Sequence, residues 1–263
     1  MSGIFYQDFL CSGATDAPEL VILHGWGMHS GVWAAFLPLL TPHARVRCID
    51  LPGFGRSAGM PIPPSLESMM DALQDVAPAQ AVWMGWSLGG VLAMEMASRF
   101  PQRVSRLVLM AATPCFVQRD DWPCAMPAQE FSAFSDSVRQ DAASALKRFL
   151  PLQCQGSVSS RQDLRFLQSC IAQAAAPSRK ALEQGLALLR ASDCRADFSA
   201  LSMPMLCLFG EQDALVPASV ASALSSLQPA STVRLIEGAA HVPFLSHPKT
   251  CADAVLHFIG GRP

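Results

Sequence analysis

A serine at position 87 lies in a short segment whose spacing suits nucleophilic catalysis. Residues 85–89 read Gly-Trp-Ser-Leu-Gly, the G-x-S-x-G pattern of a serine held on a sharp turn between a strand and a helix. The segment ends an apolar, strand-like run (79–87) and precedes a helical pattern (88–101). Glycines are needed because the turn brings the serine close to the next helix. We interpret Ser87 as a nucleophile; the alternative is a Gly-Ser loop without chemistry.

A serine hydroxyl needs a base to accept its proton, and His241 is the best placed of the six histidines. It follows a strand-like run and a Gly-Ala-Ala turn, where a base would be presented at the carboxyl edge of a sheet. His247, six residues further on and before a proline, is the alternative. The remaining histidines fall in an early turn, in loops or in the closing helical pattern: His24, His29, His43 and His257.

The acid that orients the base should lie between the serine and the histidine in chain order. Asp213 follows the strand-like run 203–210 in the turn Gly-Glu-Gln-Asp-Ala-Leu-Val-Pro. From there its carboxylate can reach the far nitrogen of the imidazole, fix its tautomer and stabilise the imidazolium. Glu211 is the alternative. We prefer Asp213, because Glu211 directly follows the glycine that ends the strand.

Attack on an ester carbonyl creates an oxyanion, which backbone N–H groups must stabilise. The residue after the nucleophile, Leu88, supplies one donor. The second should come from the loop after the first strand-like run, which reads His24-Gly25-Trp26-Gly27, and we assign it by position to Trp26. We interpret His24 as a hydrogen-bonding brace rather than a base.

Apolar runs ending in turns recur along both halves of the chain. They cover residues 19–25, 44–53, 79–87, 105–114, 203–213 and 231–241. The runs are rich in Val, Ile and Leu and nearly continuous, which is typical of parallel strands covered by helices on both faces. The expected fold class is α/β, with a mostly parallel central sheet flanked by helices.

The pattern becomes purely helical after the fourth run. Helices are expected at 127–150, 160–175 and 177–191. We therefore predict a core made of two segments, residues 1–114 and 196–263, and an inserted helical cap over residues 115–195.

Composition narrows the functional classes further. Hydrophobic residues make up 51% of the chain and charged residues 15%, with a net charge of -2, which favours a globular protein without affinity for nucleic acid or a membrane surface. The N-terminal segment has no basic region followed by an apolar stretch, so no signal peptide is expected. Nine scattered cysteines without a C-x-x-C pair indicate reduced thiols in the cytoplasm rather than disulfides or a zinc site. No metal or other cofactor is needed.

Several longer motifs carry a family resemblance. They are DLPGFGRS (50–57), GEQDALVP (210–217), TPCFVQRDDWP (113–123), KRFLPLQ (147–153) and SSRQDLR (159–165). With the serine motif, they make the chain similar to α/β-hydrolases over its whole length. The three stretches within residues 113–165 make it resemble, more narrowly, the family of pimeloyl-acyl-carrier-protein methyl ester esterases.

The resemblance implies hydrolysis of a methyl ester on an acyl chain attached to a carrier protein, in biotin synthesis, by a cytoplasmic monomer without a cofactor. It also implies that Trp26 and Leu88 form the oxyanion hole and that Phe149 lines the acyl channel. Three arginines match family positions that contact the carrier: Arg148, Arg161 and Arg165. A fourth family arginine is replaced here by Ser144.

The charge pattern of the cap supports an acidic partner. Residues 147–180 contain six basic residues and one acid, and Arg161 and Arg165 share a helix face because they are four residues apart. Such a surface can steer an acidic protein, although a solvated helix face is the simpler interpretation. Two other functions stay open: a general short-chain carboxylesterase or lactonase acting on small esters without a carrier, and a non-catalytic ligand-binding protein.

Overall fold

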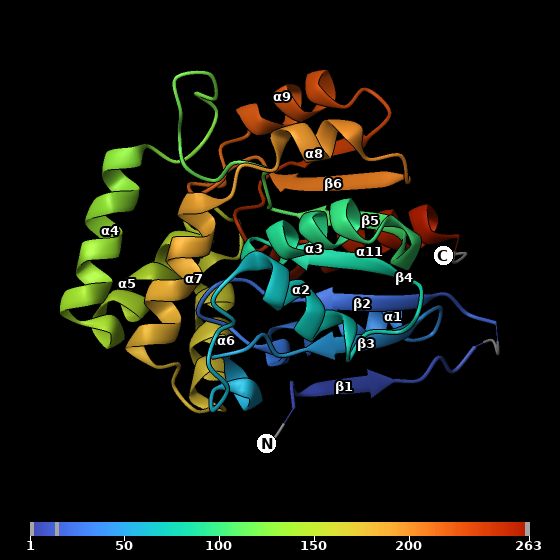
Figure 1. Cartoon of the computed structure of the whole chain (residues 1–263), viewed down its shortest axis with the longest axis horizontal. Coiled ribbons are helices and arrows are strands. Elements are labelled where there is room, and N and C mark those ends of the chain that lie inside the picture. Colours follow the sequence, from blue (N-terminus) through green and yellow to red (C-terminus); the bar gives the residue numbers. More distant parts are fainter. Residues whose placement is uncertain (1–2, 14–15, 261–263) are drawn as a thin grey trace.

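A seven-stranded sheet forms the centre of the computed structural model, which describes residues 3–13 and 16–260 (Figure 1). The strands are β1 (Tyr6–Phe9), β2 (Glu19–Leu23), β3 (Arg45–Ile49), β4 (Ala81–Trp86), β5 (Val104–Met110), β6 (Met205–Gly210) and β7 (Thr232–Ile236). Their spatial order is β1-β3-β2-β4-β5-β6-β7, and only the pairing of β1 with β3 is antiparallel. The six strand-like runs of the sequence each overlap one of β2 to β7, so the expected fold class is confirmed.

Helices cover both faces of the sheet, which explains the continuous apolar strands. One face packs against α2 (Leu66–Gln74), α3 (Leu88–Arg99), α8 (Arg195–Ala200) and α9 (Ser219–Leu227). The other packs against η1 (Ser30–Trp33), α1 (Leu37–Leu40), α10 (Pro243–Ser246) and α11 (Pro248–Ile259). Along β4, Trp83 belongs to the first core and Met84 to the second, as the alternation of side chains in a strand requires. Two short turns of helix, η2 (Gly55–Ser57) and η3 (Pro101–Arg103), complete this part.

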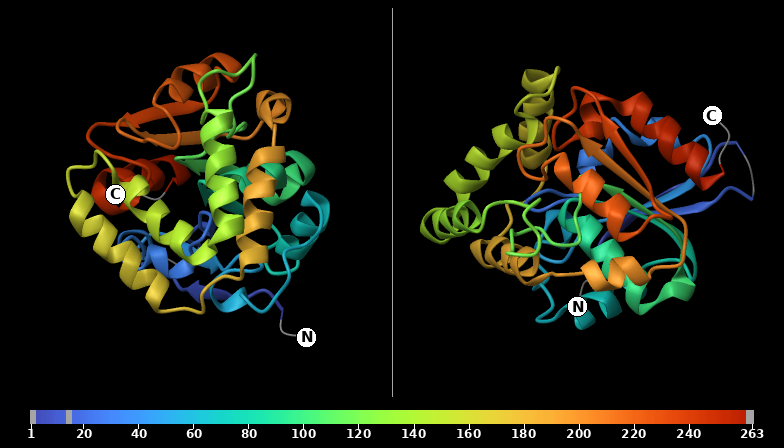
Figure 2. Two further views of the ribbon diagram at one scale, coloured as in Figure 1. Left: turned by 90° about the vertical axis from the view of Figure 1, so that its left-hand side faces the viewer. Right: turned by 90° about the horizontal axis from the view of Figure 1, so that it is seen from above.

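Four further helices lie together beyond the carboxyl ends of the parallel strands (Figures 1 and 2). They are α4 (Ala128–Gln140), α5 (Ala142–Cys154), α6 (Ser160–Ala172) and α7 (Arg179–Ala191), and they fall between β5 and β6 in the chain. We call these four helices the cap. The limits expected for it, residues 115–195, stay a prediction.

The expectation of one helix over residues 127–150 is wrong. The structure has two helices there, divided at Asp141, whose Oδ1 accepts a hydrogen bond from Ser144 N at 3.0 Å. An aspartate in this position accepts a hydrogen bond from a free N–H at the start of a helix. Asp141 therefore ends α4 and begins α5. None of the helices within residues 3–13 and 16–260 is both long and apolar enough to cross a membrane.

Candidate active site

Ser87 lies on the turn between β4 and α3, in a backbone conformation that few side chains adopt. Its φ is 54° and its ψ is -118°, outside the regions that are sterically favoured for a residue other than glycine. Its backbone N–H donates to Met110 O at 3.0 Å, which ties the turn to the next strand. The residue is 5% exposed and lies at the end of α3 that carries the positive pole of the helix dipole.

The neighbouring glycines are required by close backbone contacts. A Cβ atom on Gly85 would overlap the backbone of Gly89 and Gly90, and one on Gly89 would lie 2.5 Å from Leu23 O. Such a distance is far below van der Waals contact. The G-x-S-x-G pattern is therefore a steric requirement of this turn.

Asp213 and His241 are joined by a buried hydrogen bond. Asp213 Oδ2 lies 2.8 Å from His241 Nδ1, and the two side chains are 0% and 1% exposed. The other carboxylate oxygen accepts hydrogen bonds from Leu215 N at 2.8 Å and Val216 N at 2.9 Å. A carboxylate held in this way selects the imidazole tautomer with its proton on Nδ1, which leaves Nε2 able to accept one.

The two alternative residues lie elsewhere. Glu211 Oε2 accepts a hydrogen bond from Gly238 N at 3.2 Å, and His247 Nδ1 lies 2.9 Å from Ser246 Oγ. Asp213 and His241 are thus the acid and base candidates that the fold brings together. Among the residues that the structure describes, Ser87 Oγ forms no hydrogen bond with His241, a contact that often tightens only when substrate is bound.

Trp26 and Leu88 each present a free backbone N–H. Trp26 lies in the loop after β2, and Leu88 is the first residue of α3. In the described part of the chain neither backbone N–H has a hydrogen-bond partner. The indole of Trp26 is fixed by a 2.9 Å hydrogen bond from its Nε1 to Leu182 O in α7. Two such donors could stabilise an oxyanion.

A buried histidine braces the loop that carries Trp26. His24 Nδ1 lies 2.8 Å from Gly25 O, and His24 Nε2 accepts a hydrogen bond from Leu51 N at 2.9 Å. Because Leu51 N can only donate, the proton of the neutral ring lies on Nδ1. Burial lowers the pKa of His24 to about 4, so the ring is neutral near pH 7. These bonds match the structural role expected for His24.

An apolar cavity lies between Ser87 and the cap. It is narrow, with a volume of about 20 Å³, and its walls include Trp26 and Phe149. Phe149 packs edge-on against Trp26, with ring centroids 5.1 Å apart, and stacks on Phe134 of α4 at 5.2 Å. The sequence interpretation missed Phe134 and Phe131, which also line the cavity. Their spacing on one helix face was the available signal.

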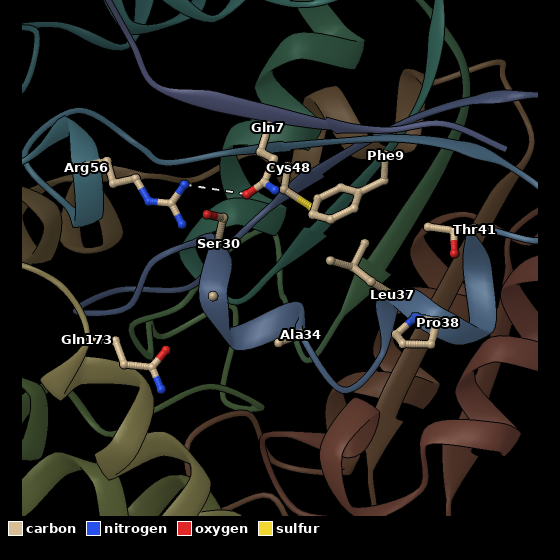
Figure 3. A pocket seen from close by; sticks show the side chains of 11 residues that line it. Gln7, Phe9, Ser30, Ala34, Leu37, Pro38, Thr41, Cys48, Arg56 and Gln173 are labelled. Atoms are coloured by element: carbon tan, nitrogen blue, oxygen red, sulfur yellow. Dashed lines mark hydrogen bonds between the residues drawn. The ribbon is translucent and has the colours of Figure 1, made fainter.

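A wider hollow lies away from these residues. Figure 3 shows it between β1, η1 and α1. Its volume is about 450 Å³. Arg56 lies at one end, where its Nη1 donates to Gln7 Oε1 at 3.5 Å. No residue of the candidate triad lines this hollow, so it is separate from the candidate active site.

The three expected docking arginines are exposed on the cap. Arg148 lies on α5, while Arg161 and Arg165 lie on α6 and line one surface hollow. Within the described residues none of the three forms an ion pair shorter than 4.0 Å. Unpaired exposed guanidinium groups can bind an acidic surface without first breaking an internal pair.

Most of the cysteines are buried and do not offer a competing nucleophile. All nine are free thiols, and seven are buried. Burial raises the pKa to about 12 for four of them: Cys154, Cys170, Cys207 and Cys251. A thiol with so high a pKa is not a reactive thiolate near pH 7.

The fold and the site define a serine hydrolase, and the chain belongs to the α/β-hydrolase fold family, whose model matches residues 18–248. A relative from Yersinia pseudotuberculosis serotype O:1b is 41% identical over 240 residues, which cover 91% of this chain and 92% of the relative. Relatives from Serratia marcescens and Klebsiella pneumoniae are 42% and 43% identical, over 93% and 90% of this chain and 94% and 92% of their own. All three are named pimeloyl-acyl-carrier-protein methyl ester esterase, which confirms the narrower family resemblance.

Solved structures show the same fold at lower identity. The bromoperoxidase from Bacillus anthracis superimposes with a TM-score of 0.84 at 24% identity, covering 98% of this chain and 95% of that one. The esterase from Exiguobacterium antarcticum gives 0.83 at 22% identity, with 98% and 96% covered. At this identity the likeness supports the architecture alone.

Proposed function

We propose that the protein hydrolyses the methyl ester of a pimeloyl chain carried on acyl-carrier protein, releasing methanol and leaving the free carboxylate on the carrier-bound chain. The observation that carries the chemistry is the 2.8 Å hydrogen bond between Asp213 and His241. The assignment of the substrate is supported by the name that relatives 41% to 43% identical to this chain share.

The reaction has two halves. Ser87 Oγ attacks the ester carbonyl carbon while His241 Nε2 accepts its proton, and the N–H groups of Trp26 and Leu88 stabilise the oxyanion. His241 then gives the proton to the departing methoxide, which leaves as methanol. Water attacks the acyl-enzyme with the same base, and the serine is regenerated. Asp213 stabilises the imidazolium in both halves.

The cap supplies the substrate contacts in this proposal. Phe149 lines the channel for the acyl chain, since its ring forms part of the cavity beside Ser87. The exposed Arg148, Arg161 and Arg165 bind the acidic carrier, so the carrier stays outside while the ester reaches the serine.

We place the enzyme in the cytoplasm, in keeping with nine free thiols, as a monomer. Sedimentation of the purified protein measures its mass in solution, which should be that of one chain.

Replacing the nucleophile tests the chemistry. Ser87→Ala should fold normally and lose turnover of any ester by about 10³-fold or more, because the covalent route is removed. A fluorophosphonate probe should label the wild type and not the variant. Undiminished turnover in Ser87→Ala would exclude the proposed triad, and an unlabelled, inactive wild type would favour a ligand-binding protein.

Charge reversal on the cap tests the substrate. Arg161→Glu with Arg165→Glu should lower kcat/KM for the carrier-linked methyl ester by about 10- to 100-fold and leave a small free ester nearly unaffected. Arg234→Glu, on the exposed edge strand β7, is the matched control and should change neither. Equal losses on both substrates would remove the docking role. No preference of the wild type for the carrier-linked ester would favour a general carboxylesterase.

A further inference from the structure

The turn that joins α5 to α6 contacts both loops of the acid–base pair. We use the name α5–α6 turn for residues 153–159, which are the last two residues of α5 and the five that follow it. We call residues 211–216, after β6, the acid loop, and residues 237–242, after β7, the base loop. In Figure 2 the yellow-green α5–α6 segment runs beside the orange-red C-terminal part of the chain, which includes the base loop.

Two backbone hydrogen bonds fasten the base loop to the turn. His241 N donates to Gln153 O at 3.1 Å, and Val158 N donates to Gly238 O at 3.3 Å. The carbonyl of Gln153 is available because Ser157 N donates instead to Cys154 O, at 3.1 Å. The last carbonyls of a helix have no helical donor, and here one of them binds the candidate base itself.

The acid loop touches the same turn through Gly156. This glycine has a φ of +88°, and a Cβ atom built on it would lie 2.8 Å from Gln212 Cβ. Gln212 directly precedes Asp213, and Gln212 N donates to Ala239 O of the base loop at 2.8 Å. Gly156 thus fits against the backbone that carries the acid, where a larger residue would push that backbone away.

A buried carboxylate holds the turn in shape. Asp163 Oδ2 accepts hydrogen bonds from Ser157 Oγ at 3.1 Å and Ser159 Oγ at 2.8 Å. Asp163 is 3% exposed and Ser157 is 7% exposed. Two side chains of the turn are therefore bonded to one carboxylate in the first turn of α6, which ties the turn to that helix.

We infer that the α5–α6 turn positions the Asp213–His241 pair for catalysis, with Gly156 as a positioning residue. The inference rests on the proposed function, because it assumes that this pair is the acid and base. Both loops follow the carboxyl ends of strands, and a loop holds a side chain in place only where other segments restrain it. The α5–α6 turn, which is remote in sequence, restrains both loops through these contacts. The cap therefore positions the acid and base in addition to contacting the substrate.

The test is Gly156→Ala, assayed with p-nitrophenyl butyrate, a small free ester that needs no carrier. We expect kcat to fall by about 10- to 100-fold with little change in KM, since small displacements of catalytic groups have effects of this size. Gly260→Ala is the matched control. Gly260 has a φ of +84°, but a Cβ atom there would meet nothing within 4 Å, so it bears the same backbone strain without moving a loop. Its kcat should equal that of the wild type.

A second variant covers the case in which Gly156→Ala does not fold. Ser157→Ala combined with Ser159→Ala removes the two hydroxyl groups that Asp163 holds, and it should lower kcat by about 3- to 10-fold. In both variants the far-downfield proton NMR signal of His241 Nδ1–H should broaden or move. A wild-type kcat with an unchanged signal, in either folded variant, would overturn the inference. Failure of this inference can be told apart from failure of the proposed triad, because only in the second case would Ser87→Ala stay active.

Discussion

Trp86 Nε1 donates a 2.8 Å hydrogen bond to the carbonyl oxygen of His241, so the residue before the candidate nucleophile is bonded to the candidate base. The indole is fully buried, and its ring centroid lies 5.7 Å from that of the imidazole. One side chain therefore fixes the distance between the turn of Ser87 and the base loop, although the two are more than 150 residues apart in the chain.

Trp86→Phe should weaken both stability and turnover. The buried carbonyl of His241 would lose its donor, which costs about 1–3 kcal/mol of unfolding free energy. We expect kcat on a small ester to fall by about 10-fold, as the base loop shifts. Trp83→Phe is the control on the same strand: it leaves a similar cavity, but its indole N–H is buried without a partner, so the loss of stability should be smaller and turnover should not change. Urea unfolding and steady-state kinetics measure both variants.

Asp213→Asn and Glu211→Gln separate the two acid candidates. The first should lower kcat by about 10⁴-fold, because an amide favours the wrong imidazole tautomer. The second keeps an oxygen able to accept the hydrogen bond from Gly238 N and should keep near-normal turnover. A large loss in Glu211→Gln with an active Asp213→Asn would reverse the assignment. Circular dichroism should show that both variants are folded.

Acid should destabilise the protein through His24. Burial lowers the pKa of His24 from its usual 6.5 to about 4, so the unfolded chain binds a proton in this range while the folded chain does not. The contribution of neutral His24 to the free energy of unfolding is therefore fully present above about pH 6.5. It is lost as the pH falls toward 4, and the total loss is about 3 kcal/mol. The measurement is urea unfolding at pH 7 and at pH 4.5.

His24→Asn provides the comparison for this pH effect. The variant should be less stable at pH 7, because Leu51 N loses its acceptor, yet it should lose less stability on acidification than the wild type. The other five histidines are present in both proteins, so the difference isolates His24. Equal losses from pH 7 to pH 4.5 would show that His24 is not the group that titrates.

Phe149→Ala should alter acyl preference. Removing a ring that packs on Trp26 and Phe134 should cost about 3 kcal/mol of stability. It should also raise KM for a seven-carbon acyl ester more than for an acetyl ester. Phe198→Ala, in the fully buried core, should destabilise the protein similarly without changing the chain-length preference. A series of p-nitrophenyl esters tests this, and an unchanged preference in Phe149→Ala would exclude it from the channel.

Local sequence was enough to predict the fold class and to select candidate site residues. The strands β2 to β7 are continuous apolar runs, and the serine turn needs glycines that the sequence displays. Strand β1 was not predicted, because it is short and polar and pairs antiparallel at the edge of the sheet. The break at Asp141 was missed because apolar spacing continues across it, from Val138 to Ala145.

Long-range backbone contacts could not be predicted. The bond between His241 N and Gln153 O joins two main-chain groups, so no residue type signals it. The same holds for the fit of Gly156 against Gln212, since a glycine in a turn does not indicate which segment it approaches. These contacts depend on how the cap sits on the core, which only the three-dimensional structure gives.

The fastening of the cap limits how substrate enters. Helix α7 is bonded to the indole of Trp26 through Leu182 O, and the α5–α6 turn is bonded to the base loop. A cap that lifted as one rigid lid would break the support of both the oxyanion loop and the base. In the described chain α4 has no hydrogen bond to these loops, only ring contacts. Substrate must therefore enter without displacing α7 or the α5–α6 turn from the core.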